Sequence, residues 1–251
     1  MNRKLCLILL ALALTVTAFA QSEADFEVGL TEDGAGVVIK KYIGKEADVN
    51  IPAQIQGMPV REIGGSAFEG NSIIANVVIP MGVTRIGNSA FAYSSLSSIT
   101  IPQGVADIGD LVFDNCESLK KVSLPEGITK ISRGLFFDCS TLAEITLPAS
   151  IEIIERKAFY GCSTLTSIAL PASIKKIHLG AFYGCLTLTT VTIPESVEKI
   201  EFYYYRSWVG RDELGLTQDK SEEMGPFQNC PKLTLASQAA LRKAGYKNEY
   251  F

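Results

Sequence analysis

Cysteine is the first residue type in this sequence whose spacing suggests chemistry. After Cys6, five cysteines follow at steps of 23, 23, 23 and 45 residues, at positions 116, 139, 162, 185 and 230. In an exported protein such a set suggests disulfide bonds, whereas a zinc site needs closely spaced pairs with histidine nearby. The odd count and the regular step favour neither. We predict a row of buried, reduced cysteines that pack as small apolar residues.

The single histidine is the next candidate for catalysis. His178 occupies a position that glycine, serine or glutamate holds elsewhere in the pattern described below, so we expect it to be exposed. A nucleophilic pair with Cys185 would require that cysteine to leave the core. No phosphate loop, dinucleotide fingerprint or catalytic-triad signature is present. We therefore predict no catalytic residue, no metal site and no cofactor.

A segment between Ile200 and Phe227 is rich in residue types that dominate protein interfaces. It separates these two residues by 27 positions where the regular pattern has 5, and it contains the only tryptophan of the chain. Tyrosine, tryptophan and arginine bury large areas and keep a polar group. A hairpin that shields the end of the core is the alternative. We predict that this insertion binds a partner through Tyr203, Tyr204, Tyr205, Arg206, Trp208 and Arg211.

The same insertion carries the acidic residues on which an enzymatic alternative depends. Asp212, Glu213, Glu222 and Glu223 lie near one another in sequence, and paired carboxylates hydrolyse glycosidic bonds. A charged loop is more often simply solvated. A glycan-acting enzyme therefore remains an alternative to a binding protein.

A second aromatic set recurs with the period of the cysteines. Phe137, Tyr160 and Tyr183 each follow a phenylalanine of the regular pattern. If successive units stack, these three residues form a stripe on one side of the protein. Aromatic side chains anchor contacts with proteins and glycans. We predict this stripe as a second partner-binding element.

The elements that position these residues belong to a repeat of 22 to 23 residues. Prolines at 80, 102, 125, 148, 171 and 194 mark it, and a phenylalanine column keeps the same step from Phe68 to Phe182 and resumes at Phe227. One unit reads L-x-x-I-x-L-P-x-x-I-x-x-I-x-x-x-A-F-x-x-C. The L-x-x-I-x-L segment predicts a short strand with one buried face, proline ends that strand at a corner, and A-F-x-x-C predicts a short helical or 3-10 turn.

Such units bury their apolar residues only by stacking on neighbours, so the repeat predicts a solenoid. We expect a mostly β, right-handed curved coil with short helical or 3-10 turns, a β cap at its N-terminal end and a short helix over Ser237–Gly245 at its C-terminal end. The predicted division is a signal peptide at 1–20, an N-terminal cap at 21–59, repeats at 60–200, the insertion at 201–226, and a last partial repeat with its cap at 227–251.

These motifs resemble the bacterial BspA-like, or treponemal-type, leucine-rich repeats. The units Ile131–Cys139, Ile154–Cys162 and Ile177–Cys185 fit the pattern closely, whereas the first two units have Asn71 and Ser94 in place of cysteine. The resemblance covers nearly all of the chain after residue 20. It implies surface exposure and protein binding, including attachment to host matrix proteins or to other microbes. Function does not follow from a fold alone.

The leader and the charge set the expected location. Arg3 and Lys4 precede an apolar run that is too short to span a bilayer and ends at Ala18-x-Ala20, as in a cleavable secretory signal. The net charge is −4 and the basic residues are scattered, which argues against nucleic acid as a partner. We expect a secreted or cell-surface, non-catalytic protein that binds a host or microbial surface protein or glycan. A self-associating scaffold is a further alternative, and the oligomeric state is open.

Overall fold

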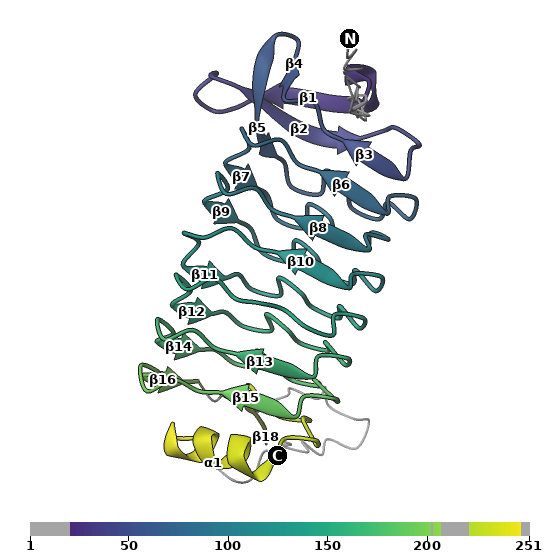
Figure 1. Ribbon diagram of the computed structural model, residues 1–251. Coiled ribbons are helices and arrows are strands. Elements are labelled where there is room, and N and C mark those ends of the chain that lie inside the picture. Colours follow the sequence, from purple (N-terminus) through teal and green to yellow (C-terminus); the bar gives the residue numbers. More distant parts are fainter. Residues whose placement is uncertain (1–20, 202, 207–220, 247–251) are drawn as a thin grey trace, which may run out of the picture.

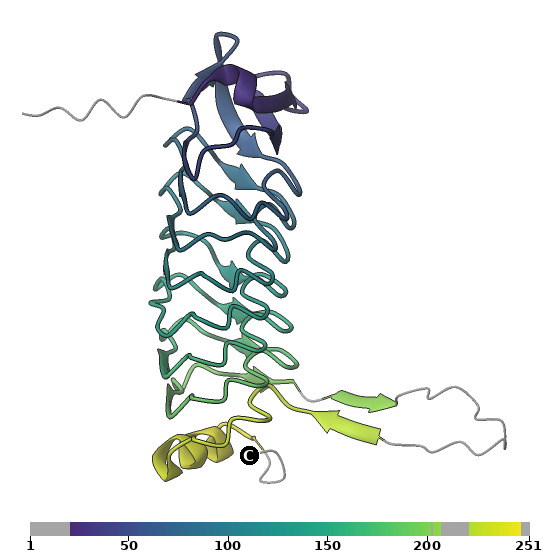
Figure 2. The ribbon, with the colours of Figure 1, turned by 90° about the vertical axis from the view of Figure 1, so that its right-hand side faces the viewer.

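The computed structural model describes residues 21–201, 203–206 and 221–246, and these residues form one elongated solenoid (Figure 1). Figure 2 shows the stacked turns from the side. Each turn of the coil is one repeat unit, so residues about 23 positions apart lie one above the other. The predicted repeat solenoid is confirmed.

Two columns of short parallel strands run along the solenoid. The first column comes from the L-x-x-I-x-L segments and contains β3 (Asp48–Asn50), β6 (Asn76–Val78), β8 (Ser98–Thr100), β10 (Lys121–Ser123), β13 (Ser167–Ala169) and β15 (Thr190–Thr192). The second follows the proline corner and contains β7 (Arg85–Ile86), β9 (Asp107–Ile108), β11 (Lys130–Ile131), β12 (Ile153–Ile154), β14 (Lys176–Ile177) and β16 (Lys199–Ile200).

The strand register follows the sequence repeat. Val77 pairs with Ile99, which pairs with Val122 in the next unit. The central residue of each first-column strand points into the core and its two neighbours point outward, as the alternation predicted. The first column is interrupted once, because residues 144–146 form no strand between β10 and β13.

A stack of phenylalanine rings fills the centre of the coil. Each ring is at most 1% exposed, and the ring centroids of successive units lie between 4.9 and 5.8 Å apart, from Phe68 through Phe91, Phe113, Phe136, Phe159 and Phe182 to Phe227. Tyr42 continues this spine at its N-terminal end, and Tyr246 closes it edge-on at the other end. The register survives the insertion, because the Phe182 N–H donates to the Pro226 carbonyl at 2.7 Å.

The N-terminal end is closed by strands, as predicted. After a 3-10 turn, η1 (Glu23–Asp25), strand β1 (Phe26–Leu30) pairs antiparallel with β2 (Val37–Tyr42), and β2 pairs in parallel with β5 (Met58–Ile63). The short strand β4 (Gln54–Ile55) folds back on β5. β1 thereby covers the edge that the second strand column would otherwise expose.

The C-terminal end is closed in part by the helix α1 (Leu235–Lys243). The helix begins two residues earlier than predicted, because the Thr234 hydroxyl accepts a hydrogen bond from the Ser237 N–H at 3.2 Å and caps the first turn. It ends at Lys243, and two residues later Gly245, with a φ of +94°, reverses the chain so that Tyr246 enters the core. The Ser237 hydroxyl accepts a hydrogen bond from the Val191 N–H, which joins the helix to β15.

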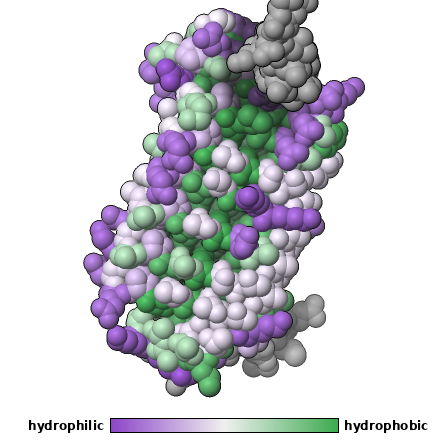
Figure 3. Space-filling model, in the orientation of Figure 1, coloured by the Kyte–Doolittle hydropathy of each residue, from purple (hydrophilic) through white to green (hydrophobic). Residues whose placement is uncertain are grey.

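The faces of the solenoid differ in polarity. In the orientation of Figure 1, apolar residues form a band along the length of the molecule and hydrophilic residues line its margins (Figure 3). No helix in the described ranges has the length and apolarity that a bilayer crossing requires. The predicted domain boundaries at 20, 59, 200 and 226 stay a prediction.

Candidate binding surface

Each unit turns at its A-F-x-x-C segment, and the cysteine row holds these turns together. The five thiols are at most 1% exposed and form no disulfide, as predicted. Each Sγ also donates to the carbonyl oxygen of the core phenylalanine in the preceding unit, at 3.1 or 3.2 Å. The row therefore does more than pack as small apolar residues. Ser94 replaces cysteine in the same column, and its hydroxyl lies 3.4 Å from the Cys116 thiol.

The chemistry of these thiols is suppressed by their surroundings. Burial raises the pKa of Cys116 to about 11, and burial also raises the pKa of Cys139, Cys162 and Cys185. The thiolate is the form that acts as a nucleophile or metal ligand. Within the described ranges no cluster of three or more histidine, cysteine or acidic side chains is arranged to hold a metal ion.

The residue after the core phenylalanine faces outward, and three successive units place an aromatic ring there. The rings of Phe137 and Tyr160 stack with centroids 4.7 Å apart and planes 2° apart, and those of Tyr160 and Tyr183 stack at 4.8 Å and 8°. We call these three residues the aromatic ladder. The turn backbone sets this spacing, because the carbonyls of Phe137, Tyr160 and Tyr183 accept N–H bonds of 2.7 to 2.8 Å from the preceding unit.

Stacking determines which part of each ring is available to a partner. In the interior of the ladder the ring faces cover one another, so the rings offer mainly their edges and the tyrosine hydroxyls. A sugar that stacks on aromatic residues needs an open ring face. The Asn229 amide donates to the Tyr183 hydroxyl at 2.9 Å, which ties the ladder to the unit after the insertion.

One lysine lies against the ladder. Lys157 Nζ is 5.6 Å from the ring centroid of Phe137 and 5.4 Å from that of Tyr160, which is cation–π distance. Lys157 has a φ of +57°, a left-handed conformation that Gly134 and Gly180 adopt at the equivalent positions. This conformation disfavours a residue with a side chain.

Acidic side chains continue the turn edge toward the N-terminus. Asp114 precedes Phe137 in the ladder column, and Asp138 follows Phe137 in the chain. Gly161 lets Asp138 lie close to the next turn, because a Cβ at position 161 would be 1.8 Å from the Asp138 carboxylate. Together with Glu69 and Glu117, these residues are called the acidic edge. These acidic residues carry no signal of their own in the sequence, although the repeat places Asp114 in the ladder column.

The insertion forms an antiparallel hairpin at its base. Strand β17 (Tyr203–Arg206) pairs with β18 (Ser221–Met224), with Tyr204 opposite Glu223 and Tyr205 opposite Glu222. Both strands project away from the solenoid (Figure 2), and the end of the core is covered by α1 instead. The predicted contact residues Tyr203, Tyr204, Tyr205 and Arg206 lie on β17, and Glu222 and Glu223 lie on β18. Trp208, Arg211, Asp212 and Glu213 lie outside the described residues.

The histidine is less exposed than expected. His178 keeps 18% of its side-chain exposure, because it lies between two carboxylates of neighbouring units. Its Nδ1 contacts Glu201, and its Nε2 lies 3.9 Å from Glu155. Hydrogen bonds from Lys199 and His178 outweigh the effect of burial and lower the pKa of Glu201. These contacts fix the last residue before the insertion. Cys185, the partner that a nucleophilic pair would need, is fully buried.

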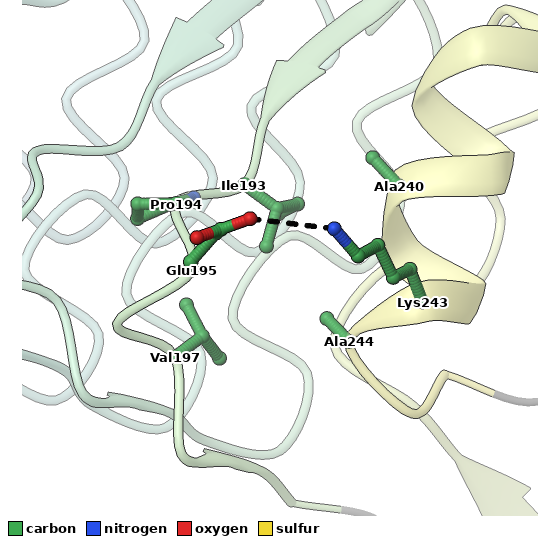
Figure 4. A pocket seen from close by; sticks show the side chains of 7 residues that line it. All are labelled: Ile193, Pro194, Glu195, Val197, Ala240, Lys243 and Ala244. Atoms are coloured by element: carbon green, nitrogen blue, oxygen red, sulfur yellow. Dashed lines mark hydrogen bonds and ion pairs between the residues drawn. The ribbon is translucent and has the colours of Figure 1, made fainter.

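A hollow of about 390 Å³ lies beside α1, at the part of the end face that the helix leaves open. Figure 4 shows Ile193, Pro194 and Val197 on one wall and Ala240 and Ala244 on the other, with an ion pair of 3.4 Å between Lys243 and Glu195 at the rim. Ile193 and Val197 belong to columns that are buried in the preceding units. The hollow thus results from the absence of a further unit.

The geometry defines a class of protein: a repeat solenoid with a buried aromatic spine, a closed N-terminal end, and exposed aromatic and acidic residues along its turns. The chain matches the sequence-family model of the BspA type leucine-rich repeat region. The match comprises six copies, over residues 47–163, 84–210 and 136–237. The chain belongs to this family of bacterial leucine-rich-repeat proteins.

Solved structures of bacterial proteins agree with this assignment. A leucine-rich repeat protein of T. pallidum is 25% identical with a TM-score of 0.52, and the match covers 91% of this chain and 97% of that one. A leucine-rich cell surface protein of Faecalibacterium prausnitzii is 30% identical with a TM-score of 0.55, covering 76% and 59% of the two chains. A leucine-rich repeat protein of Eubacterium ventriosum shares the fold at 22% identity, with a TM-score of 0.59 and 74% and 55% covered. No curated protein matches the chain.

Proposed function

We propose that this chain is a non-catalytic, extracytoplasmic binding protein that presents its repeat surface to a macromolecular partner on a host or microbial surface. The aromatic ladder carries this proposal. The fold requires one aromatic residue in each unit, the core phenylalanine, and the ladder adds a second aromatic residue in three units where other units have Glu69, Ala92, Asp114 or Gln228.

The partner that we favour is a protein. Because the interior ring faces of the ladder are covered by stacking, the hydroxyls and ring edges remain for contact, and these suit hydrogen bonding and packing with a polypeptide. The hairpin is part of the same proposal, with Tyr203, Tyr204, Tyr205, Arg206, Trp208 and Arg211 as contact residues. Pro226 and Gln228, which follow β18, bond to Phe182 and Gly184 beside the ladder, so the base of the hairpin and the ladder are neighbours.

Capture of purified extracellular-matrix proteins, whole bacterial cells and a glycan panel by the immobilised chain without residues 1–20 tests the proposal. We expect a protein ligand to be retained, and Tyr160→Ala with Tyr183→Ala to weaken its capture at least roughly tenfold, which is about 1.4 kcal/mol. A matched control on the strand face, Thr100→Ala with Thr192→Ala, should change capture little. Capture of nothing in the panel, or equal loss in both double variants, contradicts the proposal.

Hydrolase assays distinguish the enzymatic alternative. Turnover of a glycan substrate that disappears when Asp212, Glu213, Glu222 and Glu223 are changed to Asn or Gln would replace a binding role with a catalytic one. Sedimentation at several concentrations separates a self-associating scaffold, because assembly that grows with concentration in the absence of any partner indicates self-association.

A further inference from the structure

The acidic edge and the aromatic ladder form one continuous surface along the turns. Asp114 and Phe137 occupy the same column in adjacent units, and the Asp138 carboxylate, next to Phe137 in the chain, lies against Gly161, which follows Tyr160. Tyr93, which is 55% exposed, extends this surface toward Glu69. A partner that contacts the ladder therefore also meets the carboxylates.

The carboxylates of this edge repel one another. Burial, and after it the Glu69 charge, raise the pKa of Asp114 above its usual range despite hydrogen bonds from Asn115 and Tyr93. Burial, followed by the charges of Asp114 and Glu117, raises the pKa of Asp138. The charge of Asp114 is also the main reason that the pKa of Tyr93 is raised.

Ion pairs in the described part of the chain use other carboxylates, such as Glu62, Asp107 and Asp110. None of the ion pairs between described residues involves a carboxylate of the acidic edge, so this edge carries negative charge that only Lys157 partly offsets. Carboxylates that raise one another's pKa are stabilised when a cation approaches them.

Lys157 is an example within this chain of a cationic side chain that lies against the aromatic ladder and near the acidic edge. Its ammonium lies at cation–π distance from Phe137 and Tyr160, and its charge lowers the pKa of Asp138 against the other influences. One cation thus lies at cation–π distance from two rings and close enough to Asp138 to act on its charge. Asp114, Glu117 and Glu69 have no equivalent lysine beside them, because the matching position of the previous units is held by Gly134, Leu111 and Ser89.

We propose that the turn edge binds a basic segment of a protein partner, whose arginine or lysine side chains pair with the acidic edge while their stems and neighbouring apolar residues pack on the aromatic ladder. This inference rests on the proposed binding function and narrows its partner. Arginine fits both parts, because its planar guanidinium binds a carboxylate with two hydrogen bonds and its apolar stem can pack along the exposed ring edges.

Fluorescence anisotropy with synthetic peptides tests the proposal. The probe is a labelled peptide of repeating Arg-Gly-Leu, compared with Gln-Gly-Leu and Glu-Gly-Leu peptides of equal length, and the protein is the chain without residues 1–20. We expect the arginine peptide to bind at least about tenfold more tightly than the glutamine peptide, since one paired charge corresponds to roughly this factor. Binding should weaken as salt is raised through about 0.1 M.

Two double variants separate a specific surface from general attraction to an acidic protein. Asp114→Asn with Asp138→Asn should weaken the arginine peptide about tenfold or more, whereas Glu126→Gln with Glu144→Gln removes the same charge from exposed positions elsewhere and should change binding less than about twofold. Thermal unfolding of both double variants verifies that they are folded.

Tyr160→Leu tests the aromatic part and should also weaken the arginine peptide. Equal weakening by the two double variants, or equal binding of the arginine and glutamine peptides, overturns the inference. A protein ligand captured through the ladder without dependence on Asp114 or Asp138 also overturns it, but leaves the proposed binding function intact. If the panel described above yields no capture and no peptide binds, the proposed function itself fails.

Discussion

The chain contains two aromatic stacks that differ by one sequence position and by their exposure. Phe159 and its equivalents form the buried spine, with neighbouring centroids 5.3 and 5.1 Å away, and are fully buried. Tyr160 and its two neighbours form the external ladder, with centroids 4.7 and 4.8 Å apart, and keep part of their surface exposed. Both stacks follow the same repeat and the same turn.

Their occurrence separates a requirement of the fold from a feature of three units. The spine runs through every unit from Phe68 to Phe227, because a gap in it would leave a cavity against two neighbouring units. The ladder occupies three units only, and the equivalent positions elsewhere are polar or small. A residue type that recurs in every unit is therefore one that the fold requires. A residue type that recurs in only a few units, at an outward-facing position, is a candidate for binding.

Removing a spine ring should have the largest effect on stability. Phe159→Ala removes the ring between Phe136 and Phe182, and we expect a loss of about 3 to 5 kcal/mol in the free energy of unfolding. Denaturant unfolding measures it. Phe159→Leu, which retains most of the volume, should lose less. An unchanged transition midpoint for Phe159→Ala would show that the spine is not the main contribution to the core.

The cysteine row supports the spine, and its removal should cost less. Cys162→Ala deletes the thiol that donates to the Phe136 carbonyl, and we expect a loss of about 1 to 2 kcal/mol. Cys162→Ser should lose less than Cys162→Ala, because a serine hydroxyl can donate to the same carbonyl, and Ser94 shows that serine is accommodated in this buried column. Unfolding curves compare the two variants.

Thiol labelling provides an independent check on the same row. Because burial raises the pKa of these thiols, the native protein should label slowly near neutral pH, and denatured protein without residues 1–20 should give five reactive thiols. Detection of an internal disulfide by mass spectrometry in freshly prepared protein would contradict this view of the row.

The external ladder should contribute less to stability than the spine and more to binding. Tyr160→Ala breaks two stacked pairs at the surface, and we expect a loss of about 1 to 2 kcal/mol in unfolding free energy. Partner capture should also fall, by less than in the double variant Tyr160→Ala with Tyr183→Ala. A stability loss equal to that of Phe159→Ala, with capture unchanged, would mean that the ladder is part of the core and not a contact surface.

Replacing the hairpin should have the smallest effect on stability. A short Gly-Ser turn in place of residues 203–224 retains Glu201, which contacts His178, and Pro226, which pairs with Phe182. We expect the free energy of unfolding to stay within about 0.5 kcal/mol, since the described strands project from the solenoid, while partner capture is lost. A large fall in melting temperature with capture retained in the folded fraction would identify the insertion as a lid on the core.

Much of the candidate surface could be read from the repeat, and the rest required the structure. The period alone placed Phe137, Tyr160 and Tyr183 in one stripe, because any residue at a fixed repeat position recurs at one place on a solenoid. It did not select Asp114 and Asp138, since single acidic residues carry no periodic signal. It also placed His178 at the surface, because the sequence does not show that Glu155 and Glu201 lie on either side of it.

The sequence by itself determined the architecture of this protein. Apolar columns repeated every 22 to 23 residues leave no other way to bury their side chains than by stacking, so the solenoid, its phenylalanine spine and its buried cysteines followed from spacing. Only the tertiary structure decided which groups meet between turns: the thiol that donates to a carbonyl of the preceding unit, the stacked faces of the ladder and the lysine beside them. These contacts depend on distances of a few ångströms and on left-handed turn residues such as Lys157, and a repeat pattern specifies neither.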